Sequence, residues 1–123
     1  MQKTVLVADD EDELRALLAA TIGSNERYIV FEAKDGIEAL KIARKKKPDL
    51  ILLDILLPGM DGFEVCRQLK AHPDSNGIVV VMLSALAEEA DKEKARQIGA
   101  DGYFTKPFSP TALLRNLEEF LEH

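Results

Sequence analysis

The chain alternates short runs of apolar residues with longer segments in which apolar residues recur every three or four positions. Short apolar runs predict β-strands, whereas the longer spacing is typical of amphipathic helices. The runs at 50–57 and 78–83 are almost continuously apolar, as expected for strands that are buried on both faces of a parallel sheet. We expect five strands, each followed by a helix, at 3–8, 28–33, 50–57, 78–83 and 102–105.

The helical segments carry their own start and stop signals. Gly23, Pro48 and Gly99 are suited to ending the first, second and fourth helices, and Ser109–Pro110 supplies an N-cap and a first-position proline for the fifth. We expect the inward faces of the helices to include Leu14, Leu17, Leu18 and Ile22, then Ile37, Leu40, Ile42 and Ala43, then Phe63, Cys66 and Leu69, and finally Leu113, Leu114, Leu117 and Phe120.

Strands and helices in strict alternation predict an α/β fold, a single doubly wound parallel sheet with right-handed crossovers. A length of 123 residues suits one domain with one hydrophobic core region. We assign residues 1–120 to this domain. Residues 121–123 are interpreted as a tail, either derived from a tag or the start of a region that has been removed.

Composition excludes several classes of protein. No apolar run reaches the roughly 20 residues that a membrane-spanning helix needs, and residues 1–7 are too polar and too short for a signal peptide. We therefore expect a cytoplasmic protein with no membrane partner. The single Cys66 cannot form an internal disulfide, and its helical spacing predicts an inert core residue. A net charge of −6 argues against direct binding of nucleic acid by this domain.

Three further features have ordinary structural explanations. The cationic run Arg44–Lys47 could be a binding patch, but cations are favoured at the end of a helix, and we prefer that explanation. His72 has no second histidine or cysteine nearby for a metal site, so we expect it to be exposed. The segment 88–98 is a markedly polar helix, and we expect it to be weakly packed.

Asp54 is the residue that most needs an explanation. It interrupts the apolar run 50–57, and removing a carboxylate from water costs several kcal/mol unless another group pairs with it. It lies near the carboxyl end of its strand, the edge where open α/β sheets bind ligands. Other polar residues follow the remaining strands and should converge at the same edge: Asp9, Asp10, Ser84 and Lys106.

These residue types together suit phosphoryl transfer. Carboxylates that lie close together repel one another unless a cation intervenes, and a site of oxygen ligands with few carboxylates suits Mg²⁺. Lys106 and Ser84 could then bind a dianionic group through a positive charge and a hydrogen bond. Asp54 is the candidate nucleophile, because carboxylates form aspartyl-phosphates as covalent intermediates.

The chain resembles the receiver domain of two-component response regulators, including the single-domain chemotaxis regulators, from Lys3 to about Phe120. This resemblance implies a flavodoxin-like sheet with strand order 2-1-3-4-5. The motifs that carry it are Asp9–Asp10, Asp54 with the segment 58–62, Ser84–Ala85, the segment 99–103, and Lys106–Pro107–Phe108.

The resemblance also implies a role for each site residue. Asp54 would accept a phosphoryl group from a sensor histidine kinase or a phosphotransfer protein, and the domain would catalyse only its own phosphorylation and dephosphorylation. Asp10, Asp54 and the backbone carbonyl of Leu56 would bind Mg²⁺, with Asp9 assisting through water. Lys106 would pair with a phosphoryl oxygen and with Asp54.

The switch and the output are also expected from the family. The Lys106–Pro107 bond would be cis. Ser84 and Tyr103 would form a two-state switch that reshapes the face made by the fourth helix, the fifth strand and the fifth helix. That face would act on an output protein or an effector domain, and a phosphorylation-dependent dimer remains open.

Two departures from the family pattern have consequences. Leu56 and Leu86 occupy positions that influence how water reaches the acyl phosphate, and apolar groups there predict slow self-dephosphorylation. Gly102, Ala112 and Asn116 stand where the winged-helix transcription-factor class usually has charged residues that make dimer salt bridges, which does not favour that class.

Three other functions fit the sequence less well than the receiver does. An aspartate-nucleophile phosphatase would need a second acid where Leu56 stands. A flavodoxin-like flavin binder would need a phosphate-binding loop after the first strand, where Asp9 and Asp10 would repel phosphate. A receiver fold that has lost its activity would lack one of the polar site residues, and all of them are present.

Overall fold

The computed structural model describes residues 2–122, which form a five-stranded parallel sheet in the order β2-β1-β3-β4-β5. This confirms the predicted fold class and strand order. The elements are β1 (Lys3–Ala8), α1 (Asp12–Gly23), β2 (Tyr28–Ala33), α2 (Gly36–Lys46), β3 (Leu50–Asp54), α3 (Gly62–Ala71), β4 (Val79–Ser84), α4 (Glu89–Gln97), β5 (Gly102–Thr105) and α5 (Pro110–Leu121).

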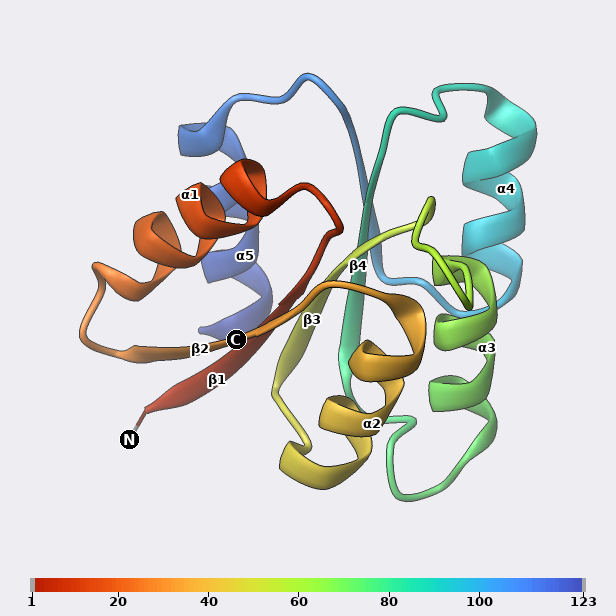
Figure 1. The fold of residues 1–123 in the computed structure, drawn as a ribbon, viewed down its shortest axis with the longest axis horizontal. Helices are drawn as coiled ribbons and strands as arrows, with labels where there is room; N and C mark the ends of the chain where they lie inside the picture. The colour runs from red at the N-terminus through yellow and green to blue at the C-terminus, as the bar shows by residue number, and fades with distance from the viewer. Residues whose placement is uncertain (1, 123) are drawn as a thin grey trace.

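Helices cover both faces of the sheet. Helices α1 and α5 lie on one side, and α2, α3 and α4 lie on the other (Figure 1). The central strand β3 is buried at every position, and its side chains alternate between two cores, as the pleat of a strand requires. Leu50 and Leu52 join the core under α1 and α5, whereas Ile51 and Leu53 join the core under α2 and α3.

Side-chain caps start three of the helices. Asp35, Asp61 and Ser109 each accept a hydrogen bond from the backbone N–H three residues later, at the first turns of α2, α3 and α5. Such caps satisfy backbone donors that have no partner within the helix. The predicted N-cap at Ser109 and first-position proline at Pro110 are confirmed.

Two apolar residues predicted to face inward do not. Leu17 and Ile37 are 54% and 60% exposed, which makes them two of the most exposed large apolar side chains. In α2 the buried positions are Gly36, Ala39, Leu40 and Ala43, so the sheet-facing stripe passes beside Ile37. The spacing of apolar residues identified the helices correctly but made the predicted buried stripes of α1 and α2 too wide.

Two segment ends also differ from the predictions. Strand β3 ends at Asp54, not at residue 57, because the chain turns there and Gly62 N–H donates to the Ile55 carbonyl at 2.8 Å. Helix α5 continues through Leu121, which is buried in the core under α1 and α5. The predicted tail at 121–123 also includes His123, which lies outside the described residues.

The remaining expectations for single residues agree with the structure. Cys66 is fully buried, and burial raises the pKa of its thiol to about 11, as expected for an inert core residue. His72 is exposed. Helix α4 buries only Ala95, whereas α3 buries five residues, so α4 is the more weakly packed of the two. Within residues 2–122, no helix is sufficiently long and apolar to cross a membrane.

Candidate functional site at the carboxyl edge of the sheet

Asp54 is the last residue of the central strand, and only 4% of it is exposed. Its two carboxylate oxygens have different partners. Oδ1 accepts a hydrogen bond from Leu56 N–H at 3.0 Å, and Oδ2 accepts one from the Lys106 ammonium at 2.9 Å. The buried acid is therefore paired, as its position in an apolar strand requires.

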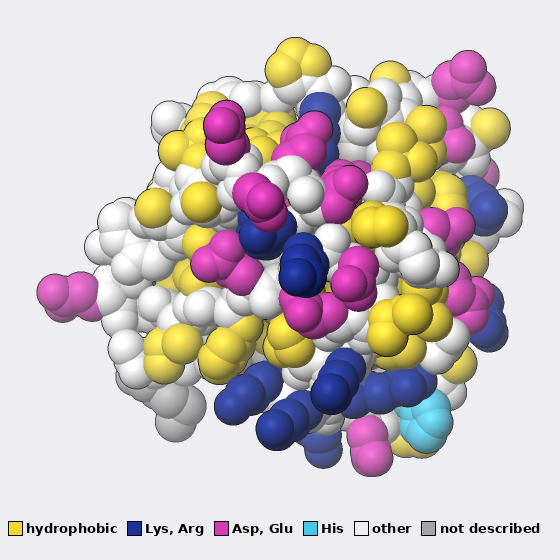
Figure 2. Space-filling view, in the orientation of Figure 1, with side chains coloured by type: hydrophobic (Ala, Val, Ile, Leu, Met, Phe, Trp, Pro, Cys, Tyr) yellow, Lys and Arg dark blue, Asp and Glu magenta, His cyan; other side chains and the backbone are white. Residues whose placement is uncertain are grey.

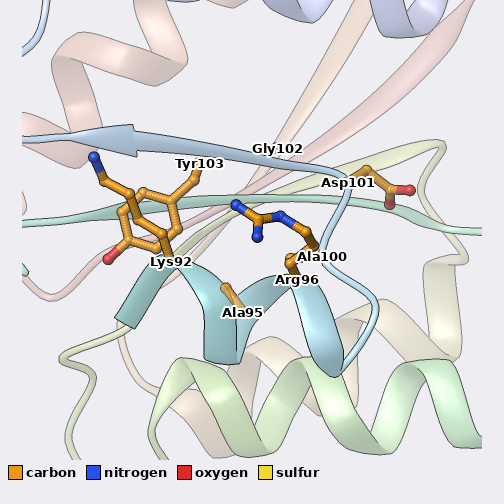
Figure 3. A pocket seen from close by; sticks show the side chains of 7 residues that line it. All are labelled: Lys92, Ala95, Arg96, Ala100, Asp101, Gly102 and Tyr103. Atoms are coloured by element: carbon orange, nitrogen blue, oxygen red, sulfur yellow. The ribbon is translucent and has the colours of Figure 1, made fainter. Parts of the chain in front are cut away.

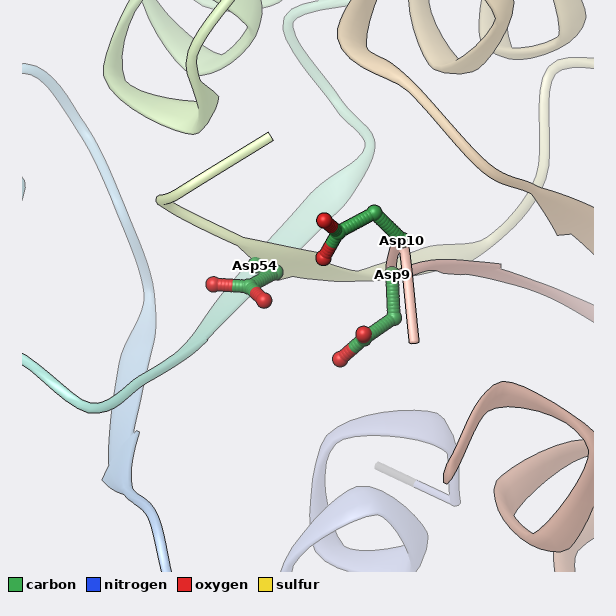
Figure 4. A group of neighbouring side chains, drawn as sticks. All are labelled: Asp9, Asp10 and Asp54. Carbon is green, nitrogen blue, oxygen red and sulfur yellow. The ribbon is translucent and has the colours of Figure 1, made fainter. Parts of the chain in front are cut away.

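Asp9 and Asp10 reach the same place from the neighbouring strand β1. Asp9 is 1% exposed, and its carboxylate accepts from Glu11 N–H at 2.8 Å and from Lys106 Nζ at 3.0 Å. Asp10 is exposed. One carboxylate oxygen from each of Asp9, Asp10 and Asp54 lies within 4.8 Å of the others, and the three side chains border a common space (Figure 4).

Lys106 is the cation of this cluster and arrives from the end of β5. Its backbone N–H donates to the Ser84 carbonyl at 2.8 Å, which holds the start of the β5–α5 loop against β4. The Lys106–Pro107 peptide bond is cis. Burial by itself lowers the pKa of the ammonium, but the hydrogen bonds and charges of Asp54 and Asp9 outweigh it and raise that pKa. Lys106 therefore remains charged at neutral pH.

The pKa of Asp54 is also raised, although Lys106 alone would lower it. Burial is the largest cause, and the neighbouring Asp9 charge adds to it. The hydrogen bonds from Lys106 and from Leu56 N–H act in the opposite direction and are too weak to compensate. Three carboxylates lie beside one ammonium in this cluster, and this excess of negative charge favours an added cation.

Ser84 and Tyr103 meet at the backbone of Leu86. Ser84 ends β4 and is fully buried, and its Oγ accepts from Leu86 N–H at 3.2 Å. The Tyr103 hydroxyl donates to the Leu86 carbonyl at 2.6 Å. The two residues predicted to form the switch are therefore joined through one peptide segment.

A hollow of about 350 Å³ lies between α4 and β5, beside Tyr103 (Figure 3). Asp101, at its edge, accepts from Val80 N–H at 2.8 Å and from the Lys70 ammonium at 3.1 Å. These bonds hold the start of β5 against β4, whereas α4, on the other side of the hollow, has little buried surface to hold it. The side chain of Tyr103 thus borders a space whose opposite wall is the weakly packed helix α4.

Two glycines allow the loop after Asp54 to lie close to its neighbours. A Cβ added to Gly62 would lie 2.4 Å from the Asp54 carbonyl oxygen, and one added to Gly36 would lie 1.7 Å from the Met60 carbonyl oxygen. Both distances are impossible for a real side chain. Glycine at these positions is therefore required for the loop to pass between β3 and α2.

The structure adds Arg15, which the sequence analysis did not identify. From the first turns of α1, its Nη1 donates to the Asp9 carbonyl at 2.8 Å, and its other nitrogens contact Asp12 at 2.7 Å and Glu32 at 3.3 Å. Arg15 thus ties the acidic loop to α1 and to strand β2. In the sequence, the only indication of this role is the position of Arg15 on the helix, after a run of acidic residues.

Carboxylate oxygens are ligands that hard divalent cations prefer, and Asp9, Asp10 and Asp54 supply only oxygen. The donor set and the excess negative charge therefore fit Mg²⁺.

The model of the response regulator receiver domain matches residues 5–118 of the chain. The chain belongs to the response regulator receiver domain family. It is therefore a two-component signalling module, and membership of this family leaves the phosphatase and the flavin binder without support.

Curated relatives of this receiver domain are transcriptional regulators. The alkaline phosphatase synthesis transcriptional regulatory protein PhoP of Bacillus subtilis is 47% identical over 110 residues, which is 89% of this chain and 45% of that protein. The phosphate regulon transcriptional regulatory protein PhoB of Pseudomonas aeruginosa is 40% identical over 119 residues, 97% of this chain and 52% of that protein. The chain spans about half the length of these relatives.

Solved receiver structures have the same fold. A chemotaxis response regulator of Vibrio cholerae superimposes with a TM-score of 0.90 at 31% identity, covering 98% of this chain and 99% of that one. The receiver domain of a Pseudomonas aeruginosa sensor histidine kinase, solved with a magnesium ion in its active-site cleft, gives a TM-score of 0.88 at 28% identity and covers both chains fully.

Proposed function

We propose that Asp54 is the phosphoacceptor of this receiver domain. A carboxylate oxygen of Asp54 attacks the phosphorus of a phosphohistidine on a sensor kinase or a phosphotransfer protein. The new O–P bond forms as the P–N bond breaks, and the electron pair of that bond returns to the imidazole. The observation that carries the proposal is the Asp54 carboxylate, buried at the end of the central strand, 2.9 Å from Lys106 and beside two further acids.

The neighbouring side chains divide the remaining work. Asp9, Asp10 and Asp54, with the backbone carbonyl of Leu56, would hold Mg²⁺, and the magnesium in the Pseudomonas receiver supports this assignment by analogy. When bound, the ion supplies charge neutralisation at the phosphoryl oxygens. Lys106 places a second positive charge beside the attacked group, which is the stabilisation that phosphoryl transfer needs.

We infer that the phosphoryl group acts on Ser84 and Tyr103 through Leu86. If the Ser84 hydroxyl turns to the phosphoryl group, its bond to Leu86 N–H is lost, and the Leu86 carbonyl that holds Tyr103 moves with the segment. The face made by α4, β5 and α5 then changes shape for its partner.

The relatives support a proposal for the output of this switch. Because both are named transcriptional regulators and are about twice as long as this chain, we propose that the phosphorylated face controls an effector domain or output protein in transcription. Their similarity weighs against the inference, drawn from Gly102, Ala112 and Asn116, that the winged-helix transcription-factor class is not favoured. A phosphorylation-dependent dimer remains part of this proposal.

Intact-protein mass spectrometry tests the chemistry directly. The domain is incubated with acetyl phosphate and Mg²⁺, beside an Asp54→Asn variant and a sample with EDTA. We expect a gain of about 80 Da, one phosphoryl group, only in wild type incubated with acetyl phosphate and Mg²⁺ without EDTA. A folded, Mg²⁺-replete domain that gains no mass would show instead a receiver fold that has lost its activity.

A further inference from the structure

Positive charge is distributed unevenly over the molecule. Six of its sixteen lysines and arginines fall between residues 34 and 47, although the chain has a net charge of −6. Within residues 2–122 none of these six forms an ion pair with a carboxylate, whereas seven cations elsewhere do. The group comprises Lys34, Lys41, Arg44, Lys45, Lys46 and Lys47. Figure 2 shows lysines and arginines gathered along the lower edge of the face where Figure 1 shows α2.

The end of the helix explains only part of this group. Arg44, Lys45 and Lys46 lie in the last turn of α2, where the helix dipole favours cations. Lys41 lies further back along the helix, so the dipole does not account for it. An isoleucine that is 60% exposed, Ile37, precedes Lys41 by one turn and has no structural explanation either.

Some of these residues border a hollow between α2 and the β3–α3 loop, which we name the α2 groove. It has a volume of about 460 Å³ and is lined by Ile37, Leu40, Lys41, Arg44, Lys45 and Met60. A second hollow of about 420 Å³ continues it past Ile37 and Lys41 toward Pro58 and Gly59. The surface therefore has an apolar floor with cations along one side.

The acids at the far end of the helix do not neutralise these cations. Asp35 and Glu38 border the second hollow, and each accepts a hydrogen bond from backbone, but within residues 2–122 neither forms an ion pair with a lysine or arginine. Asp35 caps α2 by accepting from Glu38 N–H at 2.7 Å, and Glu38 accepts from Lys34 N–H at 3.0 Å. Arg44 contacts the neutral side chain of Gln68 at 3.0 Å. The charge of the groove thus remains available to a partner.

We propose that the α2 groove docks an acidic, amphipathic polypeptide segment of a partner protein. Apolar side chains of the segment fill the floor at Ile37 and Met60, and its carboxylates pair with Lys41, Arg44 and Lys45. Binding of an amphipathic segment in such a groove uses apolar contact for affinity and charge for orientation.

The apolar floor distinguishes this partner from other polyanions. A nucleic acid backbone would use the cations but leave Ile37 and Met60 without contacts. A flat anionic membrane would not follow a concave surface. The groove lies outside the Asp54 cluster, so the proposal holds whether or not Asp54 accepts a phosphoryl group, and its test uses the unphosphorylated domain.

Fluorescence anisotropy with a designed probe tests the proposal. The probe is a fluorescein-labelled helical peptide of about 14 residues with leucine every third or fourth position and glutamate at most others. Two matched peptides replace either the leucines by serine or the glutamates by glutamine. We expect the probe to bind wild type, and each replacement to weaken binding by at least about tenfold.

Variants of the domain locate the site. Ile37→Ser and Lys41→Glu should each weaken binding by about tenfold or more, and both positions are at the surface, where folding tolerates such changes. Arg115→Glu is the matched control, because Arg115 is an exposed cation on α5 without an ion pair within residues 2–122. We expect it to change the affinity less than about twofold.

Several results would overturn the proposal. The first is the same loss of affinity in Arg115→Glu as in Lys41→Glu, which would reveal general charge attraction. The second is no binding of the probe at millimolar concentration. The third is tighter binding of a labelled DNA duplex or of phosphatidylserine vesicles, unaffected by Ile37→Ser, which would assign the cations to a different partner.

Discussion

At the scale of single residues, one lysine serves several acids. Lys106 Nζ lies 2.9 Å from Asp54, 3.0 Å from Asp9 and 3.5 Å from Glu11. Two of these acids are almost fully buried, and burial makes each uncompensated charge costly. We therefore expect the two buried carboxylates, which share one ammonium, to lower the stability of the fold.

Replacing Asp54 by asparagine should therefore stabilise the domain in the absence of divalent cations. The amide keeps the shape and an oxygen for Lys106 and removes one negative charge from a cluster of three acids. We expect a gain of about 1 kcal/mol and a rise in Tm of about 4 °C, measured by circular dichroism in EDTA.

Asp101→Asn is the control for that experiment. Asp101 is a carboxylate with favourable partners, the Lys70 ammonium and Val80 N–H, and it is far less buried. Its replacement should lower Tm. A fall in Tm for Asp54→Asn of similar size would mean that the Asp54 charge stabilises the fold.

Leu56 and Leu86 bear on the lifetime of the phosphoryl group. Leu56 is 53% exposed beside Asp54, and Leu86 is half-buried beside Ser84. Apolar side chains there cannot orient an attacking water by hydrogen bonding. We expect slow self-dephosphorylation. It is measured as the loss of the phosphoryl mass over time after acetyl phosphate is removed.

A Leu56→Asn variant makes this test specific. An amide in place of Leu56 can orient water, so we expect hydrolysis about tenfold faster, a change of about 1.4 kcal/mol in the barrier. The control is Leu17→Asn. Leu17 is an exposed leucine on α1, outside the Asp54 cluster, and its replacement should leave the rate unchanged. A wild-type half-life of seconds would count against the argument.

The site residues were predictable because a parallel sheet brings all its carboxyl ends to one edge. Asp54, Asp9 and Lys106 could be placed together from the strands alone. Arg15 could not, because its role depends on the direction in which a long side chain leaves its helix. The same limit applies to the meeting of Ser84 and Tyr103 at Leu86, which depends on loop geometry.

At the scale of elements, the helices differ in how firmly they are held. Helix α3 buries five residues, and α4 buries only Ala95 while carrying acids and bases along the rest of its length. Its Lys94 ammonium lies 4.3 Å from the centroid of the Phe63 ring on α3. Elements with few buried apolar contacts open first.

We therefore expect α4 to exchange its backbone amide hydrogens faster than α3. Hydrogen exchange followed by mass spectrometry on peptides from the two helices measures this difference. Acetyl phosphate with Mg²⁺ should change the exchange of α4 and of the segment around Tyr103 while leaving α3 unchanged. Equal protection of the two helices, unaffected by acetyl phosphate, would contradict a mobile α4.

The number and order of the elements could be predicted from the spacing of apolar residues, whereas their edges could not. Leu17 and Ile37 fit the helical spacing and nevertheless face outward, because spacing does not determine how wide a stripe the sheet covers. Strand β3 ends at Asp54 because the Gly62 amide bonds to Ile55. That contact depends on tertiary structure.

At the scale of the whole molecule, binding of a cation at one edge of the sheet should stabilise the entire fold. The candidate ligands lie at the ends of β1 and β3, two adjacent interior strands, so a cation that binds them only in the folded state opposes global unfolding. Above its Kd, each tenfold increase in Mg²⁺ should add about 1.4 kcal/mol to the free energy of unfolding.

Asp10→Asn separates this effect from changes in the fold itself. Asp10 is exposed, so solvent screens its charge far more than that of the buried Asp54, and within residues 2–122 its side chain makes no hydrogen bond or ion pair; the variant should therefore differ little from wild type in EDTA. With Mg²⁺ the wild-type Tm should rise with the logarithm of the concentration, and the Asp10→Asn Tm should rise much less. An equal rise in both proteins would place Mg²⁺ elsewhere, whereas no rise in either would remove the cation from the proposed chemistry.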